Sequence, residues 1–270
     1  MAANFSIFDR VDAEALIGML RKETGPATNN RSLPRKHTLA NIFSRAVNKM
    51  MPIEDVVYDD YPHLTGELEA IDKIFQTYKR YKRENNFLDF DDLLVYLLEL
   101  LKNHADLRER ISAAYHYVMV DEYQDTNKIQ AQILYLLTSA QQNIMVVGDD
   151  SQSIYAFRGA NFRNIMRFPD MFPGTRIIAL EENYRSVQPI LNLTNSIIRQ
   201  AKEKYSKNLF TRKTGGSRPV LVDAQNENDQ SLFIVDKIQQ LCQQGIALNQ
   251  IAVLFRAGFH SFDLEIELTR

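Results

Sequence analysis

Two adjacent acidic residues, Asp121 and Glu122, follow the short apolar run 116–120, at a point where a buried strand is expected to end. A carboxylate in this position can hold Mg²⁺ beside the phosphates of a nucleotide, directly or through water. A second carboxylate next to it can orient and deprotonate an attacking water molecule. The pair alone indicates this chemistry no more strongly than it indicates a solvent-exposed acidic turn.

The elements that would position this pair are predicted by apolar runs of strand length at 116–120, 143–147 and 176–180. Helices are predicted between and after these runs, at 129–137, at 162–167 and from 187 onward. Short apolar strands that alternate with helices indicate a buried parallel sheet and therefore an α/β fold. Ligands bind at the carboxyl ends of such strands. The acidic pair and the segment 148–158 are expected at those ends.

The residues on either side of this predicted sheet have different patterns. Up to residue 86 the apolar side chains fall at helical spacing, and prolines separate the helices, so we expect a helical subdomain. A strongly apolar helix is predicted at 91–101. After Gly215 and Gly216 a second α/β unit is predicted, with strands at 220–222 and 251–255 and a helix at 229–242.

Longer motifs are more specific than the acidic pair. DEYQDTN at 121–127 is followed by GDDSQSIYAFRGA at 148–160 and LEENYRS at 180–186, with FLDFDDLL at 87–94 upstream. In this order they resemble the superfamily 1 DNA helicases of the UvrD/PcrA/Rep family, in which the first three correspond to motifs II, III and IV. The segment 251–268 resembles the start of the family's second motor domain.

The resemblance implies a RecA-like parallel sheet with flanking helices and an N-terminal helical subdomain. It divides the chain into three parts. Residues 1–86 resemble the family's helical 1B subdomain, and residues 87–186 resemble the rest of the first motor domain, 1A, with motifs II, III and IV. Residues 187–270 resemble the start of the second motor domain, 2A.

The resemblance also implies roles in ATP hydrolysis for residues of the first motif. Asp121 would ligate Mg²⁺, and Glu122 would be the general base that activates water for attack on the γ-phosphate of ATP. Gln124 would link this site to the neighbouring motifs.

Three residues further along the chain are implied to contact the nucleotide itself. Gln152 would sense the γ-phosphate, Tyr184 would stack on the adenine, and Arg185 would contact the γ-phosphate. These residue types suit the tasks, because arginine offers a planar and permanently charged fork and tyrosine offers a flat ring.

Aromatic residues are implied to bind single-stranded DNA and duplex junctions. Tyr155 and Phe157 lie two residues apart, so in an extended segment both point to one side. In the family the equivalent residues stack on DNA bases, Phe90 resembles another such contact, and Arg158 would support the same stretch through its charge. Phe157 stands where many relatives have tryptophan. Without the flanking glycines and charged residues, core packing would be the better interpretation.

No glycine begins the phosphate-binding pattern G-x-x-x-x-G-K-[ST]. The lysine and backbone N–H groups that would hold the β- and γ-phosphates are therefore missing from these 270 residues. In the family this loop lies upstream of the 1B insertion, and motifs V and VI follow the start of 2A. We therefore expect an internal fragment, inactive as an ATPase by itself, of a longer enzyme.

Composition excludes several other classes. Hydrophobic residues make up 45% and charged residues 24%, as in an ordinary globular protein. One cysteine, Cys242, excludes an internal disulfide framework and a four-cysteine zinc site. There is neither an apolar run of transmembrane length nor the pattern of a signal peptide, so we expect a cytoplasmic protein that does not enter a membrane.

The net charge of −2 conceals an uneven distribution. Residues 24–53 contain no acid, Lys79 to Arg83 are rich in basic residues, and seven basic residues between 199 and 218 stand against the single acid Glu203. Such clusters attract polyanions if they share a face, although any one of them is more simply a solvated helix face.

The leading hypothesis is a fragment of an ATP-dependent 3′→5′ DNA helicase that moves along single-stranded DNA, with the direction implied by the family. Two alternatives stay open. The chain could be a non-catalytic module that binds single-stranded DNA or a protein, or it could be the helicase part of a helicase-nuclease.

Overall fold

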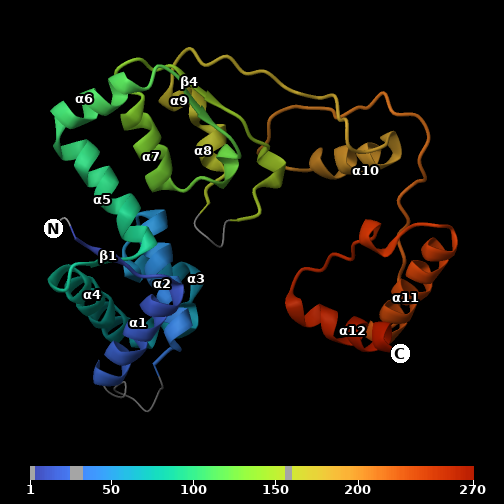
Figure 1. The fold of residues 1–270 in the computed structure, drawn as a ribbon, viewed down its shortest axis with the longest axis horizontal. Helices are drawn as coiled ribbons and strands as arrows, with labels where there is room; N and C mark the ends of the chain where they lie inside the picture. The colour runs from blue at the N-terminus through green and yellow to red at the C-terminus, as the bar shows by residue number, and fades with distance from the viewer. Residues whose placement is uncertain (1–3, 25–32, 156–159) are drawn as a thin grey trace. The chain divides into compact units, whose positions relative to one another are not determined.

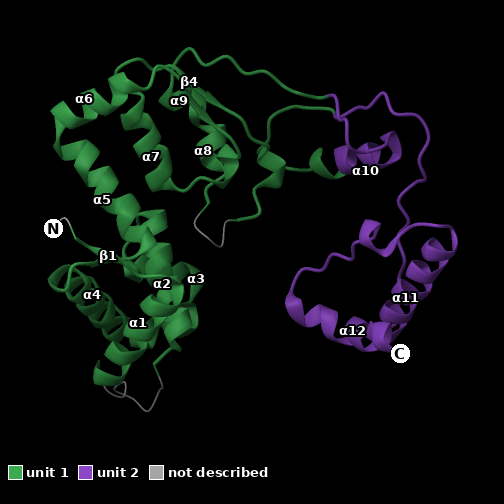
Figure 2. Cartoon of the chain, in the orientation of Figure 1, with its two compact units in different colours: residues 1–181, 197–208 green, residues 182–196, 209–270 purple. Residues whose placement is uncertain are grey.

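A computed structural model describes residues 4–24, 33–155 and 160–270 (Figure 1). Mutual contacts divide the chain into two compact units (Figure 2). The first unit comprises Met1–Glu181 and Ile197–Asn208, and the second comprises Glu182–Ser196 and Leu209–Arg270. The domain boundaries predicted at residues 86 and 186 stay predictions.

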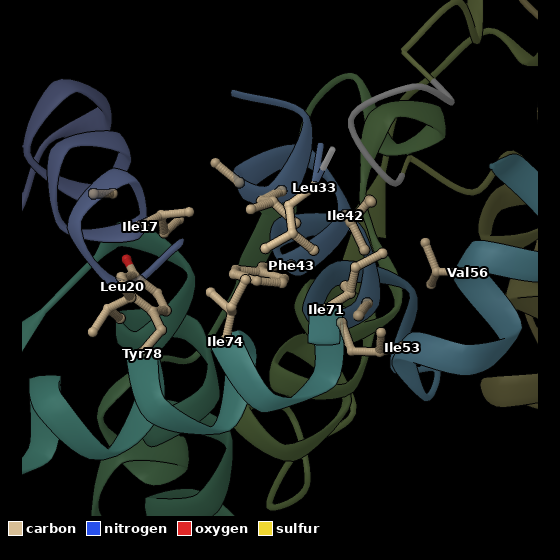
Figure 3. Close-up of a cluster of buried hydrophobic side chains, with 14 of the residues drawn as sticks. Ile17, Leu20, Leu33, Ile42, Phe43, Ile53, Val56, Ile71, Ile74 and Tyr78 are labelled. Atoms are coloured by element: carbon tan, nitrogen blue, oxygen red, sulfur yellow. The ribbon is translucent and has the colours of Figure 1, made fainter. Parts of the chain in front are cut away.

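The N-terminal part of the first unit is helical and has its own apolar core, as predicted. One helix buries Ile71, Ile74 and Tyr78, whose spacing of three and four residues places them on one face. They pack against apolar residues of the preceding helices, among them Ile17 and Ile42 (Figure 3). The elements are α1 (Arg10–Thr24), α2 (Lys36–Lys49), α3 (Ile53–Asp60), the 3₁₀ helix η1 (Pro62–Glu67) and α4 (Leu68–Glu84).

The rest of the first unit contains short parallel strands with helices packed beside them. Strand β3 (Val118–Val120) pairs in parallel with β4 (Ile144–Val146), with Met119 opposite Met145. Further upstream, β1 (Ser6–Ile7) pairs in parallel with β2 (Phe87–Leu88). The helical elements are α5 (Phe90–Asn103), α6 (Ala105–Ala114), η2 (Tyr123–Asp125), α7 (Lys128–Leu137), η3 (Asp150–Gln152), α8 (Arg163–Met166) and α9 (Phe168–Met171).

One face of the β3–β4 pair is covered and the other is exposed. Val120 and Ile144 pack against a core cluster that includes Ile165 and Phe168 of α8 and α9. Met119 lies on the other face and is 71% exposed. The described residues thus form a helix-rich α/β unit with two-stranded parallel sheets, rather than a wide parallel sheet.

Helix α5 begins where a capping box fixes it, because Asp89 accepts from the backbone N–H of Asp92 and the Asp92 side chain accepts from that of Asp89. Helix α7 begins in the same way with Asn127 and Gln130. Both boxes satisfy N–H groups that the first turn of a helix leaves unpaired. Each box therefore fixes the start of a helix next to a motif, FLDFDDLL for α5 and DEYQDTN for α7.

The second unit contains little regular structure besides its helices. These are α10 (Gln188–Ile198), whose last two residues belong to the first unit, α11 (Glu227–Gln243) and α12 (Phe262–Thr269). Short 3₁₀ helices, η5 (Leu248–Gln250) and η6 (Gly258–Ser261), precede α12. Glu182 and Phe210 form an isolated parallel bridge. Helices α11 and α12 pack against one another.

Three predicted strands, at 176–180, 220–222 and 251–255, are wrong for this structure. These residues are all described, and none forms a strand. A strand needs a neighbour to take its backbone N–H and C=O groups, and no ladder within the described residues supplies one. Their apolar side chains consequently stay in solvent, with Leu221 95% and Leu254 93% exposed.

Candidate functional site

The acidic pair lies directly after β3, where the predicted sheet places it. Both side chains are exposed. The next residue, Tyr123, is fully buried and anchors the backbone that follows the pair. The Tyr123 ring meets Phe168 edge to face at 5.4 Å, and its N–H donates to the carbonyl of Val147 at 3.0 Å. Glu122 itself has a φ of +49°, in the left-handed region that a residue with a side chain rarely adopts.

Gln124 joins the ends of β3 and β4. It is fully buried, its Nε2 donates to Glu122 Oε2 at 2.6 Å, and its Oε1 accepts from the Asp149 N–H at 3.0 Å. A Cβ atom at Gly148 would lie 2.5 Å from that Oε1, so only glycine permits this approach. The amide of Gln124 therefore fixes the Glu122 carboxylate relative to the segment after β4.

Gln152 belongs to the same cluster through Asp149. Its Nε2 donates to Asp149 Oδ2 at 2.9 Å, while the Ser151 N–H donates to the other Asp149 oxygen at 3.0 Å. Gln152 is exposed. The structure thus brings four sequence-predicted residues to the strand ends: Asp121, Glu122, Gln124 and Gln152.

Lys207 holds this cluster from a distant part of the sequence. Its ammonium group pairs with Asp149 and, at 2.9 Å, with Asp150. Burial alone would raise the pKa of Asp149, but the hydrogen bonds from Lys207, Gln152 and Ser151 outweigh it and hold this pKa below its ordinary value. Burial alone would lower the pKa of Lys207, but the two aspartates raise it. In the sequence, Lys207 is distinguished only as one of the seven basic residues between 199 and 218.

We expect Lys207→Met to lower the free energy of unfolding at pH 7 by about 1.5–3 kcal/mol, since two carboxylates lose a charged donor. Because the pKa of Asp149 is lowered in the folded state, its pairing stabilises the fold above the ordinary pKa and stops doing so as the pH falls through the folded-state value. The free energies of unfolding of wild type and Lys207→Met, measured by urea denaturation, should therefore converge as the pH falls below about 4. Lys202→Met, at an exposed lysine nearby, is the control. A deficit that is unchanged at about pH 3 would contradict this origin.

The basic cluster at 199–218 is largely occupied within the protein. Lys204 donates to the carbonyl of Ile198, the last residue of α10, at 3.2 Å and to that of Ala201, just beyond it, at 3.0 Å. Arg212 pairs with Glu182 at 3.0 Å, and Lys213 donates to the Arg185 carbonyl at 3.0 Å. These basic groups form hydrogen bonds and an ion pair with neighbouring parts of the chain. The cluster therefore does not offer a polyanion a continuous positively charged surface.

Two of the four residues predicted to contact DNA are described. Phe90 is the first residue of α5 and is 62% exposed, and Tyr155 is exposed to 39%. Phe157 and Arg158 lie outside the described residues. Exposure of large aromatic rings is what stacking on bases requires.

A charge cluster forms around Asp89, the residue that precedes Phe90. Lys82 of α4 is 5% exposed and pairs with Asp89 and Asp92, while the Tyr78 hydroxyl donates to Asp89 at 2.8 Å. Burial would raise the pKa of Asp89, but Lys82 outweighs burial and lowers it, whereas burial and the charge of Asp89 raise the pKa of Asp92. The sequence showed these acids but not the lysine that neutralises them.

Tyr184 and Arg185 lie in the second unit and are described within it. Tyr184 is exposed, and its hydrogen bond to Glu182 raises its pKa. Asn183 organises this turn, because its Oδ1 accepts from the N–H groups of Arg185 at 3.0 Å and Ser186 at 2.7 Å. The residues of the nucleotide site as predicted are thus distributed over both units.

The acidic pair fits a Mg²⁺ ion that keeps water molecules and substrate phosphate oxygens among its ligands. Among the described residues no three His, Cys, Asp or Glu side chains gather as a metal site. Mg²⁺ is usually bound by one or two carboxylates together with substrate phosphates, rather than by an all-protein cage. Asp121 and Glu122 offer such carboxylates in an exposed position.

Sequence models of two helicase domains match this chain almost end to end. The UvrD/REP helicase N-terminal domain matches residues 1–173, and the UvrD-like helicase C-terminal domain matches residues 178–270. The chain therefore belongs to the UvrD/REP helicase family, which confirms the resemblance carried by its motifs.

Similar proteins are named ATP-dependent DNA helicase PcrA. The relative from Leuconostoc citreum is 33% identical over 273 residues, which cover 100% of this chain and 35% of the relative. Those from Staphylococcus epidermidis and Staphylococcus aureus are 32% identical over 262 and 263 residues, with 97% of this chain and 35% of the relative covered. The chain thus spans about a third of the length of the relatives that it matches.

In the part of the chain that the structure describes, no helix is both long enough and apolar enough to span a membrane.

Proposed function

We propose that this chain is part of an ATP-dependent 3′→5′ DNA helicase that couples ATP hydrolysis to movement along single-stranded DNA and to unwinding. The observation that carries the proposal is the hydrogen-bonded connection from Glu122 through Gln124 to Asp149, at the ends of two parallel strands. Membership of the UvrD/REP helicase family and the name of the relatives support it. The cytoplasm is the proposed setting.

In this proposal β3 and β4 belong to a RecA-like sheet, and the strand ends carry the chemistry. Asp121 would hold Mg²⁺, which would neutralise phosphate charge, and Glu122 would take a proton from the attacking water. Gln124 would keep the Glu122 carboxylate oriented, and Gln152 would face the γ-phosphate. The exposure of the acidic pair, together with the buried anchor at Gln124, supports these roles.

Tyr184 and Arg185 would complete the nucleotide site in the same proposal. Tyr184 offers an exposed ring for the adenine, and Arg185 offers a guanidinium group for the γ-phosphate. Their turn is held rigid by Asn183, which is a property that a binding loop needs.

We further propose that the 270 residues alone do not turn over ATP, because the phosphate-binding loop pattern is absent from them. Phosphate release from this chain should stay at background with and without single-stranded DNA. Robust turnover that Glu122→Gln abolishes would contradict this part of the proposal.

Phe90, Tyr155, Phe157 and Arg158 would contact single-stranded DNA next to a duplex junction. Phe90→Ala should weaken binding of a labelled oligothymidylate by about fivefold to a hundredfold, because base stacking is worth about 1–3 kcal/mol. Fluorescence anisotropy across a salt series measures this, and Tyr117→Ala, at another exposed ring, is the control. Equal losses in both variants would contradict a specific role for Phe90. Binding that ignores salt would contradict phosphate contacts.

A further inference from the structure

Among the described residues of the first unit, three asparagines are buried, where a polar side chain must find partners. Asn48 in α2, Asn127 at the start of α7 and Asn164 in α8 are 6%, 6% and 9% exposed. Asparagine is mostly an exposed residue, and a buried amide without hydrogen bonds is costly. Their partners therefore indicate what this part of the fold holds together.

Asn48 connects α5 to α7 through its side-chain amide. Its Nδ2 donates to Asp91 Oδ1 and to the Ser44 carbonyl, both at 2.8 Å, and its Oδ1 accepts from Asn127 Nδ2 at 2.6 Å. Helices α2, α5 and α7 pack against one another in pairs (Figure 1). The amide thus lies where three helices meet.

The direction of these hydrogen bonds is set by two groups that only accept. These are the ionised Asp91 carboxylate and the Ser44 carbonyl, so Asn48 must present its Nδ2 to both and its Oδ1 to α7. Asn127 must then present Nδ2 to Asn48, which leaves its own Oδ1 for the Gln130 N–H, 2.8 Å away. Asp91 and the Ser44 carbonyl together thereby fix the amide orientation that caps α7.

The two ends of this chain of bonds are the segments that carry the proposed site. Asp91 follows Phe90 directly, and Asn127 is the last residue of DEYQDTN. Asn164 adds a third connection, because its Nδ2 donates to the carbonyls of Thr126 at 2.9 Å and Asn127 at 3.1 Å. Neither Asn48 nor Asn127 is placed to touch a nucleotide or DNA base, since both are buried.

We propose that Asn48 and Asn127 are positioning residues that hold the acidic segment 121–127 in fixed register with the Phe90 segment. The functional meaning of that register, a connection between a DNA contact and the proposed general base, rests on the proposed function. The register itself is a property of the ligand-free chain and can be tested there.

The test uses Asn127→Asp in the full 270-residue chain. Aspartate caps a helix as well as asparagine does, so α7 keeps its start. The new carboxylate cannot donate to Asn48, and whichever way the Asn48 amide turns, two acceptors oppose each other. Hydrogen exchange is measured at about pH 8, far above the ordinary pKa of an aspartate, because burial raises the pKa of Asp91.

We expect the amides of residues 92–94 in α5 to exchange about tenfold faster in Asn127→Asp, while the Gln130 amide and α1 exchange as in wild type. Asn48→Asp, which keeps the acceptor for Asn127 but loses the donor to Asp91, should also loosen α5 and spare Gln130. Unchanged exchange in α5, or a change confined to Gln130, would overturn the proposal.

Rescue separates a directed hydrogen-bond chain from packing or from charge alone. In an Asp91→Asn background the Asn48 amide can turn over, donate to residue 127 and accept from residue 91, losing only its hydrogen bond to the Ser44 carbonyl, so Asn127→Asp should speed exchange in α5 less than it does beside Asp91. Glu99→Gln removes a charge from the exposed side of α5 without changing the chain of bonds or the capping box, and should not rescue. Equal rescue by both substitutions would show a through-space effect and overturn the proposal.

A second arm adds an oligothymidylate of roughly 12 nucleotides. In wild type we expect slower exchange at 89–94 and at 123–127, and in Asn127→Asp only at 89–94. Protection of both segments in the variant would overturn the coupling. If wild type binds no DNA, the proposed function fails, while the ligand-free exchange still decides the register.

Discussion

Glu122→Gln is expected to lower ATP turnover by about 10²–10⁴-fold in the longer helicase of which we propose this chain is part. Glutamine keeps the size of the side chain and can still accept from Gln124, whose Nε2 lies 2.6 Å from the Glu122 carboxylate. It cannot take a proton from water. Binding of nucleotide and of single-stranded DNA should stay close to wild type, as measured by equilibrium titration beside phosphate release.

Asp121→Asn supplies the comparison for this prediction. It should raise the Mg²⁺ concentration needed for half-maximal turnover, whereas the Glu122→Gln defect should persist at saturating Mg²⁺. Glu109→Gln, at an exposed glutamate on α6, controls for loss of charge alone. If Glu122→Gln kept more than about a tenth of wild-type turnover, its role as general base would be ruled out.

Lys82→Met is expected to destabilise the 270-residue chain by about 3–5 kcal/mol at neutral pH, the range for removing one partner of a buried ion pair. The methionine fills much of the same space but leaves the Asp89 and Asp92 side chains, which are only 16% and 20% exposed, without a cation. Urea denaturation measures the loss. Lys79→Met, at an exposed lysine whose ammonium lies 4.4 Å from the centre of the Phe75 ring, should cost less than about 1 kcal/mol.

The deficit caused by Lys82→Met should shrink as the pH falls. Without the lysine, burial and mutual repulsion raise the folded-state pKa of both acids above the unfolded value. A folded state with raised acid pKa values takes up protons on acidification and gains stability relative to the unfolded chain. The variant should therefore approach wild type between about pH 7 and pH 4. A deficit that grows on acidification would contradict uncompensated carboxylates as its cause.

The sequence was sufficient to predict much of the first unit, for identifiable reasons. The spacing of Ile71, Ile74 and Tyr78 predicts helix α4. The apolar runs before Asp121 and Gly148 form the parallel pair β3–β4. Local spacing carries such information because the period of a helix or a strand is a local property. The same strand pattern placed the acidic pair and the segment 148–158 at the strand ends, and the family motifs then implied roles for Asp121, Glu122 and Gln152.

What could not be predicted depends on contacts between distant residues. Nothing near Lys207 indicates that it pairs with Asp149, and nothing near Asn48 indicates that it meets Asn127, 79 residues away. The apolar runs at 220–222 and 251–255 satisfy every local rule for strands, yet a strand also needs a neighbour, which the described residues do not provide. The local pattern shows that a segment can form a strand, but whether it does so depends on a neighbouring strand with which to pair.

At Glu122 the residue whose backbone is strained by its left-handed conformation is also the residue that we propose as the general base. Glycine would adopt this φ of +49° without steric strain, whereas a residue with a Cβ atom carries a cost of about 1–2 kcal/mol. Relieving this strain with glycine would also remove the side chain that we propose as the general base, and would leave the buried Gln124 amide without its acceptor at 2.6 Å. A screen that ranks variants by melting temperature weighs only the strain against that hydrogen bond and does not register catalysis, so it should hold Glu122 fixed.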